Sequence, residues 1–104
     1  LSRLSPGFVV TDCGALQFAI FKHHAFRNNS EAALAAIDAG VNLENSVSNV
    51  PNVFSALPQL VHDGRASREA LERMARPLYL ARFLQGEFNP PELDPYRFLS
   101  PEMV

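Results

Sequence analysis

The segment Gly7-Phe8-Val9-Val10-Thr11-Asp12-Cys13-Gly14 decides the fold class of this chain. Its apolar part, Phe8–Val10, is short, continuous and rich in β-branched residues, which is typical of a parallel strand buried on both faces. Turn-forming residues precede it at Ser5-Pro6-Gly7, and polar residues follow it. The pattern predicts a buried strand with Asp12 just beyond its carboxyl end.

A helix and a second strand follow this first strand. The polar loop Arg27–Ser30 precedes an alanine-rich helix, Glu31–Ala39, and we expect Ser30 to cap that helix and Gly40 to end it. Val41–Glu44 is then a short strand that again ends in polar residues. Strand, helix, glycine and strand in this order are typical of a βαβ unit with parallel strands, so the predicted fold class is α/β.

The rest of the chain is predicted to be mostly helical and then extended. A helix or helical turn is expected at Ala15–Phe21, and a helix at Asn52–His62 with Pro58 in its first turns. Ser67 should cap the longest helix, Arg68–Gln85, in which Pro77 should cause a kink. Prolines at positions 90, 91, 95 and 101 predict an extended, irregular end.

Two strands alone do not make a stable α/β sheet, because both edges stay open and the apolar strands lack neighbours. We therefore expect the chain to be a piece of a larger fold. The net charge is −2, and no run of Lys or Arg is present, which argues against nucleic acid or an anionic membrane surface as a partner. No stretch approaches the roughly 20 apolar residues that span a bilayer.

Asp12 and Glu44 are the candidate catalytic residues, because each follows a predicted strand at its carboxyl end, where the reactive groups of parallel α/β folds gather. Two such carboxylates suggest acid–base chemistry on a sugar, or oxygen ligands for a metal. The alternative for Asp12 is to cap the helix that follows it. His23-His24 is a weak metal pair, since adjacent helical residues point in different directions and no third ligand has a suitable spacing. No metal or cofactor is expected.

Gly7–Ala15 resembles the nucleophile motif of family 3 glycoside hydrolases, which reads as a glycine, an apolar strand, Ser or Thr, Asp, a variable residue and often Gly-Ala. More of that family's pattern follows in order at Glu31-Ala32-Ala33, Ala39–Glu44, Leu57-Pro58, Gly64–Ser67 and Leu84–Pro91. The resemblance covers about Gly7 to Leu99. Asp12-Cys13 and Asp94-Pro95-Tyr96 look most like the β-xylosidase and arabinofuranosidase branch.

This resemblance implies the last two strand–helix units of a (β/α)8 TIM barrel, helix-rich, over residues 1–86, and an extended interdomain linker over residues 87–104. It implies retaining hydrolysis of β-linked xylosides or related oligosaccharides, as in xylan catabolism, with Asp12 as the nucleophile. The acid/base in such enzymes usually comes from a following α/β domain. The partners would then be that domain and the missing barrel strands of the same polypeptide, and the isolated 104 residues should be inactive.

The resemblance also suggests weaker candidates for contact with the sugar. Cys13 would line the pocket beside Asp12, His24 lies in a loop that is near the site in relatives, and Glu44 is either a substrate contact or, as we favour, structural. Asn45 stands where the xylosidase branch often has a Cys; if that Cys pairs in relatives with the one after the nucleophile, Cys13 has lost its partner.

Two rival functions remain at this stage. The chain could be a catalytically silent carbohydrate-binding or scaffold fragment, or part of a family 3 β-glucosidase or β-N-acetylhexosaminidase. The Asn28-Asn29-Ser30 sequon is compatible with secretion, so an extracellular location is the expectation.

Overall fold

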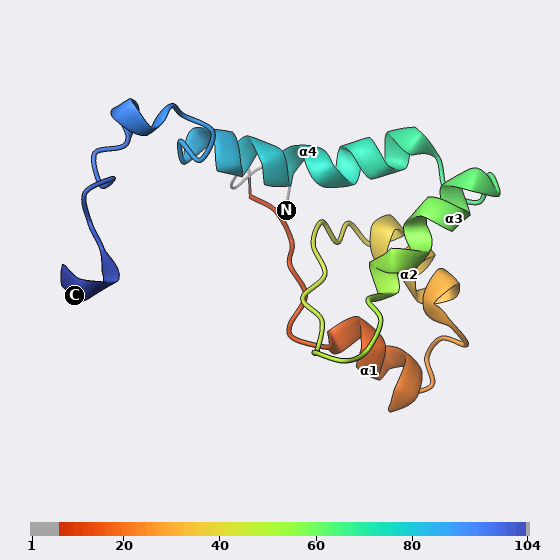
Figure 1. Cartoon of the computed structure of the whole chain (residues 1–104). Helices are drawn as coiled ribbons and strands as arrows, with labels where there is room; N and C mark the ends of the chain where they lie inside the picture. Colours follow the sequence, from red (N-terminus) through yellow and green to blue (C-terminus); the bar gives the residue numbers. More distant parts are fainter. Residues whose placement is uncertain (1–6, 104) are drawn as a thin grey trace.

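The computed structural model describes residues 7–103, and its helices are joined by loops (Figure 1). The predicted turn residues Ser5 and Pro6 lie outside the described residues. Within the described part of the chain the α-helices are α1 (Ala15–Phe21), α2 (Asn29–Asp38), α3 (Leu57–His62) and α4 (Arg68–Leu84), and the 3₁₀ turns are η1 (Val53–Ala56), η2 (Pro91–Leu93) and η3 (Pro101–Met103).

The two predicted strands are present as a pair of extended segments. Among the described residues they form one isolated parallel bridge, between Val10 and Leu43. The N–H of Thr11 donates to the carbonyl of Leu43 over 3.0 Å, and the N–H of Asn42 donates to the carbonyl of Val9 over 2.9 Å. The parallel direction is as predicted, whereas the expectation of two full strands is wrong.

The physical reason is that each extended segment has a partner on one side only among the described residues. Phe8, Val9 and Val10 keep 38%, 49% and 49% of their surface exposed, although their sequence is typical of a strand covered on both faces. Without further neighbours, the ladder does not extend beyond one bridge.

Helix α2 lies at the centre of a small apolar core. Ala32 and Ala33 are fully buried and face Val53 of η1, Leu60 of α3 and Ile20 of α1. The small alanine side chains let these neighbours approach the helix backbone closely. Burial of a side chain as large as Leu60 contributes about 1.5–3 kcal/mol. This cluster therefore stabilises the packing of α1, α2, η1 and α3.

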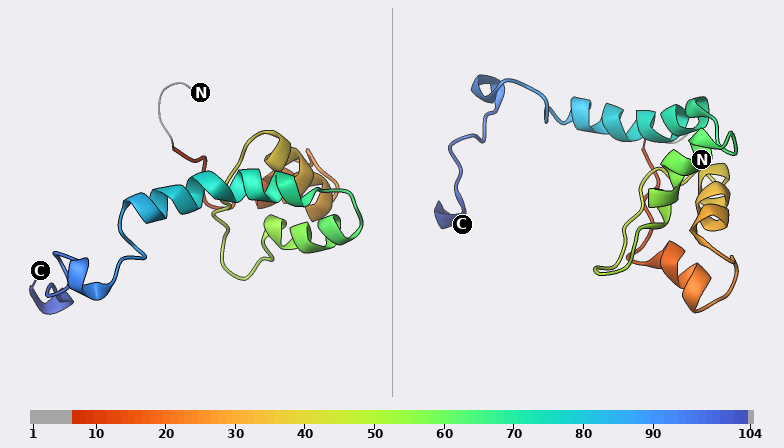
Figure 2. Two further views of the ribbon diagram at one scale, coloured as in Figure 1. Left: turned by 90° about the horizontal axis from the view of Figure 1, so that it is seen from above. Right: turned by 45° about the vertical axis from the view of Figure 1, so that its right-hand side comes forward.

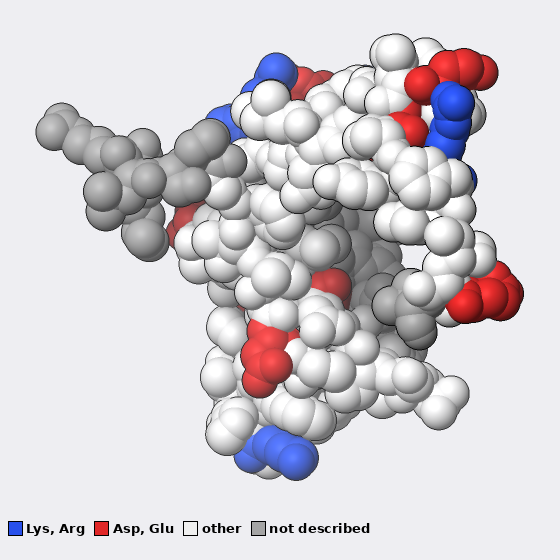
Figure 3. Space-filling model, turned by 90° about the vertical axis from the view of Figure 1, so that its left-hand side faces the viewer, with Lys and Arg blue, Asp and Glu red and all other residues white. Residues whose placement is uncertain are grey.

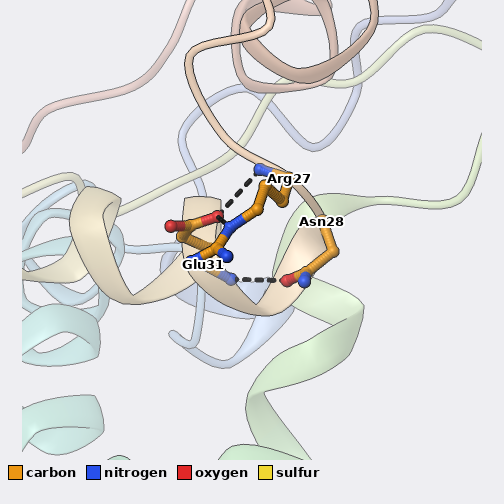
Figure 4. A network of polar contacts seen from close by, with 3 residues as sticks. All are labelled: Arg27, Asn28 and Glu31. Carbon is orange, nitrogen blue, oxygen red and sulfur yellow. Dashed lines mark hydrogen bonds and ion pairs between the residues drawn. The ribbon is translucent and has the colours of Figure 1, made fainter.

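Asn28, and not Ser30, caps α2 (Figure 4). The Oδ1 atom of Asn28 accepts the N–H of Glu31 over 3.0 Å, and a Glu31 carboxylate oxygen accepts the N–H of Arg27 over 2.8 Å. The first bond satisfies a backbone donor that the first helical turn leaves free, and the second joins Glu31 to the residue just before the cap. The hydrogen bonds from Arg27 lower the pKa of Glu31. With the cap at Asn28, α2 begins at Asn29, two residues before the predicted start.

Helix α4 runs through Pro77 without interruption and ends at Leu84, one residue before the predicted end. Ser67 caps it as expected, since its hydroxyl oxygen accepts the N–H of Ala70 over 3.1 Å. The first half of α4 packs beside α2, and the second half extends away from α1–α3 (Figures 1 and 2). No residue of α4 is buried.

Asn42 joins the extended pair to α4. Its Oδ1 atom accepts the N–H of Val9 over 2.7 Å, and its Nδ2 atom donates to the carbonyl of Met74 over 2.7 Å. Beyond α4, a paired hydrogen bond from Arg82 to the carboxylate of Glu87 fixes the point at which the chain leaves the helix. Residues 87–103 are then irregular, as predicted, with the two short 3₁₀ turns η2 and η3.

A pair of alanine variants tests which residue caps α2. Asn28→Ala should destabilise the first turns of the helix by about 1 kcal/mol. The fraction of molecules in which these turns are unfolded should then rise roughly fivefold. Ser30→Ala should have almost no effect, because alanine is a better helix former than serine inside a helix. Hydrogen–deuterium exchange of the peptide spanning α2 measures both. Faster exchange in Ser30→Ala than in Asn28→Ala would contradict this cap.

Candidate functional site

Asp12 lies in the turn between the first extended segment and α1, and its side chain is exposed. Its Oδ1 atom accepts the N–H of Cys13 over 2.8 Å. The N-cap of α1 is Gly14, and no side chain caps this helix. The helix-capping alternative for Asp12 is therefore wrong. Within residues 7–103, no hydrogen bond reaches the Oδ2 atom of Asp12, so one of its two carboxylate oxygens has no partner there.

The loop at residues 45–51 lies directly against the Asp12 turn, which we define as residues 11–14 (Figure 1). The N–H of Gly14 donates to the carbonyl of Asn45 over 2.8 Å, and the hydroxyl of Thr11 accepts the N–H of Asn45 over 2.9 Å. The thiol of Cys13 faces the carbonyl of Ser46 at 3.9 Å. The turn that follows the first extended segment and the loop that follows the second are therefore in contact.

Gly14 is needed where the turn and the loop touch. Its φ is +74°, a left-handed conformation that residues with a side chain rarely adopt. A Cβ atom at this position would lie 2.8 Å from the Cγ1 atom of Val47, which is too close for any carbon pair. Only glycine allows the loop to approach the Asp12 turn this closely.

Gln17 is a site residue that the sequence analysis missed. It lies on α1 one turn after the Asp12 turn and is only 1% exposed. Its Oε1 atom accepts the N–H of Val47 over 3.0 Å, and its Nε2 atom donates to the carbonyls of Val50 and Pro51, each over 3.3 Å. The available signal was a lone polar residue at an inward position of an otherwise apolar helix.

Glu44 has a different environment from that of Asp12. One of its carboxylate oxygens accepts the N–H of Val53 over 2.9 Å, and the other accepts the N–H of Phe54 over 2.7 Å. Two backbone donors at the start of η1 are thereby satisfied, and the end of the loop is fixed. This geometry supports the structural interpretation of Glu44. A contact between Glu44 and a substrate stays a prediction, and it would have to compete with these two bonds.

The structure does not bring His24 to Asp12. His24 follows the carboxyl end of α1, whereas Asp12 precedes its amino end, and the seven-residue helix between them is about 10 Å long. His23 and His24 are both exposed. Among the described residues, no three His, Cys, Asp or Glu side chains are close enough together to hold a metal ion.

The face shown in Figure 3 carries only small, scattered groups of charged side chains, and most of its described surface is uncharged. A surface of this kind has no broad field of one sign that would attract a polyanion. No helix within residues 7–103 combines the length and the apolar character needed to cross a membrane. A neutral ligand stays the prediction for this site.

The described residues form a helix-rich structure with two parallel extended segments, and an exposed carboxylate lies beyond the first of them. The chain matches none of the known protein-family profiles. It is similar to the exo-1,4-β-xylosidase bxlB of Emericella nidulans, with 37% identity over 91% of this chain. It is also similar to the exo-1,4-β-xylosidase xlnD of Aspergillus oryzae, with 36% identity over 93% of this chain.

A solved structure of a β-glucosidase from Erythrobacter marinus is similar as well. It has a TM-score of 0.73 and 31% identity, and the similarity covers 93% of this chain. The chain spans only 12% of each of the two xylosidases and 13% of the glucosidase chain. The relatives are thus glycosidases, as the motif around Asp12 predicted.

Two glycine variants test the contact between Gly14 and Val47. Gly40 also has a positive φ, +88°, but nothing lies within 4 Å of a Cβ atom built on it. Gly40→Ala should therefore cost only the backbone strain, about 1–2 kcal/mol of unfolding free energy. Gly14→Ala should cost about 1–3 kcal/mol more, because Val47 must also move. Urea unfolding of the two variants measures the difference, and equal losses would show that Val47 does not press on Gly14.

Proposed function

We propose that this chain is part of a retaining, exo-acting β-glycosidase of family 3, most closely a β-D-xylosidase, and that Asp12 is its nucleophile. One observation carries the proposal: the Asp12 carboxylate is exposed, does not cap a helix, and lies on a turn that is tied to the neighbouring loop. The similarity to exo-1,4-β-xylosidases over nine-tenths of this chain supports it.

The reaction needs two carboxyl groups. The free oxygen of Asp12 attacks the anomeric carbon while a carboxylic acid protonates the leaving oxygen, so that the glycosidic bond breaks and a glycosyl-enzyme ester forms. The acid, now a carboxylate, then takes a proton from water, and the hydroxide attacks the same carbon and releases Asp12. The hydrogen bond from the N–H of Cys13 holds the carboxylate of Asp12 in one orientation for this attack.

The acid/base is proposed to lie outside this chain. Glu44 is unsuited to the role, because both of its oxygens accept backbone N–H groups. The proposed source is the rest of the polypeptide, which would also supply the missing strands of a (β/α)8 barrel beside the half-exposed Phe8, Val9 and Val10. Residues 87–104 would lead to a following α/β domain.

The other predicted contacts are weaker parts of this proposal. Cys13 is exposed beside Asp12 and faces the loop that would form one side of the sugar pocket. His24 would need a loop from elsewhere to bring substrate to it, since it lies at the other end of α1. An extracellular location is proposed on the Asn28 sequon alone.

A β-glucosidase is the second candidate function. The structural similarity to the Erythrobacter marinus β-glucosidase, with a TM-score of 0.73, favours it. The residues that would distinguish a xylosyl from a glucosyl unit are proposed to lie outside this chain. A comparison of kcat/KM for aryl β-xyloside and aryl β-glucoside separates the two candidates.

Trapping the intermediate tests the role of Asp12. A 2-fluoro-xylosyl inactivator should add one sugar to the peptide that contains Asp12, as mass spectrometry of the digested full-length protein would show. Asp12→Asn should lower kcat by at least about 10³-fold, which is about 4 kcal/mol of transition-state stabilisation. Asp38→Asn, at an exposed position on α2, is the control and should keep normal activity. No adduct on the Asp12 peptide would refute the role and favour a silent binding or scaffold chain.

Expression of residues 1–104 alone tests where the second carboxyl group lies. The purified chain should show no turnover of an aryl β-xyloside, because Asp12 alone can neither protonate the leaving group nor activate water. Measurable turnover that disappears in Asp12→Asn would show that the acid/base is within these residues.

A further inference from the structure

We infer that Gln17 is a positioning residue of this site: it fixes the loop at residues 45–51 against the Asp12 turn, so that the loop forms a rigid wall beside the bound sugar. The inference rests on the proposed function for its effect on catalysis. Gln17 would act through the loop and would not itself touch substrate.

The first argument is how the Gln17 amide is used. The side chain is 1% exposed, and a buried amide is costly unless its donors and acceptor are satisfied. Its hydrogen bonds go to the backbone of Val47, Val50 and Pro51, so all of them join α1 to one loop. A leucine would fill a similar volume and suit an apolar core, so packing alone does not require a glutamine here.

The second argument is how the loop is held elsewhere. Its first residue is bonded to Thr11 and Gly14, and Glu44 fixes the start of η1 just after its last residue. The middle of the loop is not part of a helix or strand, and it includes a residue with positive φ, Asn49 at +66°. The hydroxyl of Ser46 also donates to the side chain of Asn52 over 2.6 Å. Gln17 joins the loop to α1 at three further residues: Val47, Val50 and Pro51.

The third argument is what the loop faces. Val47 lies against Gly14, and the carbonyl of Ser46 faces the thiol of Cys13, so the loop touches residues on the carboxyl side of Asp12. A loop that moves by about 1 Å would lose contacts with the bound sugar in the ground state and the transition state alike, and a loss of such uniform binding raises KM. The loop position would thus control how well substrate binds next to the nucleophile.

Two variants of the full-length protein test this inference. Gln17→Leu removes all of the bonds to the loop at similar volume, whereas Gln17→Glu keeps an acceptor for Val47 and loses the two donors. Both should speed hydrogen–deuterium exchange of the peptide spanning residues 45–52. Both should raise KM for an aryl β-xyloside about tenfold, the effect of losing about one well-placed hydrogen bond, while kcat falls by less than about threefold. The control variant Gln85→Leu, at an exposed position after α4, should change neither the exchange of residues 45–52 nor the kinetic constants.

The split between KM and kcat separates positioning from simple loss of folded protein. A variant with fewer folded molecules loses kcat in proportion and keeps the KM of the parent. An unchanged KM in folded Gln17→Leu would overturn the inference. If Gln17→Leu does not fold, Gln17→Glu decides by the same criterion.

The two proposals also fail separately. If the parent protein is not labelled at Asp12, the proposed function fails, while faster exchange of residues 45–52 in the variants would still support loop fixing by Gln17. If Asp12 is labelled and KM does not change in the variants, only the role of Gln17 is overturned.

Discussion

The contact between the Asp12 turn and the loop at residues 45–51 is the constraint on which the rest of this site depends. The turn and the loop are more than 30 residues apart in sequence and are joined by the bond from Gly14 to Asn45. The three bonds of Gln17, on α1 just after the turn, add to this contact. The partners of Gly14 and of the Gln17 amide all lie in the loop, so these bonds form only when the loop is packed against the turn and α1. Order in the turn and order in the loop are therefore coupled.

The apolar core stabilises this contact through η1, which follows the loop. Ala33 of α2 packs closely against its neighbours, which include η1, and Glu44 holds the start of η1 through the N–H groups of Val53 and Phe54. The loop is thus anchored to the core at one end and to the Asp12 turn at the other. This arrangement is the usual one for binding sites, in which loops carry the chemistry and a packed scaffold fixes their ends.

Local patterns in the sequence located α1, α2 and α4 to within about two residues and gave the parallel direction of the extended pair. The predicted helix Asn52–His62 is instead the 3₁₀ turn η1 followed by α3. Local patterns were insufficient for strand length, because a parallel strand needs neighbours on both sides and Val10 has one among the described residues. They placed the cap of α2 two residues late. Asn28 and Ser30 both suit a cap, and the deciding feature was Glu31 three residues after Asn28, the position from which an acidic side chain can reach back.

The roles of Gln17 and Glu44 were beyond the reach of sequence patterns for a different reason. Both side chains bond to backbone groups of a loop without regular structure, and no periodicity specifies where such groups lie. Glu44 shared with Asp12 every local feature that suggested chemistry: a carboxylate, a preceding apolar segment and a strand end. Only the structure separates them, since backbone donors occupy both oxygens of Glu44 and leave one oxygen of Asp12 free.

A mechanism whose two carboxyl groups come from different segments of the polypeptide would account for the number of contacts around the Asp12 turn. If Asp12 is the nucleophile and the acid/base comes from another part of the polypeptide, the two carboxyl groups must stay about 5–5.5 Å apart across a boundary between segments. A side chain that moves freely on one side of that boundary would lose this distance in most of its conformations. The positive φ of Gly14, the buried amide of Gln17 and the Cys13 bond to Asp12 each remove freedom from the side that this chain supplies. Under the proposed mechanism, this rigidity keeps Asp12 in place relative to a second carboxyl group that lies outside this chain.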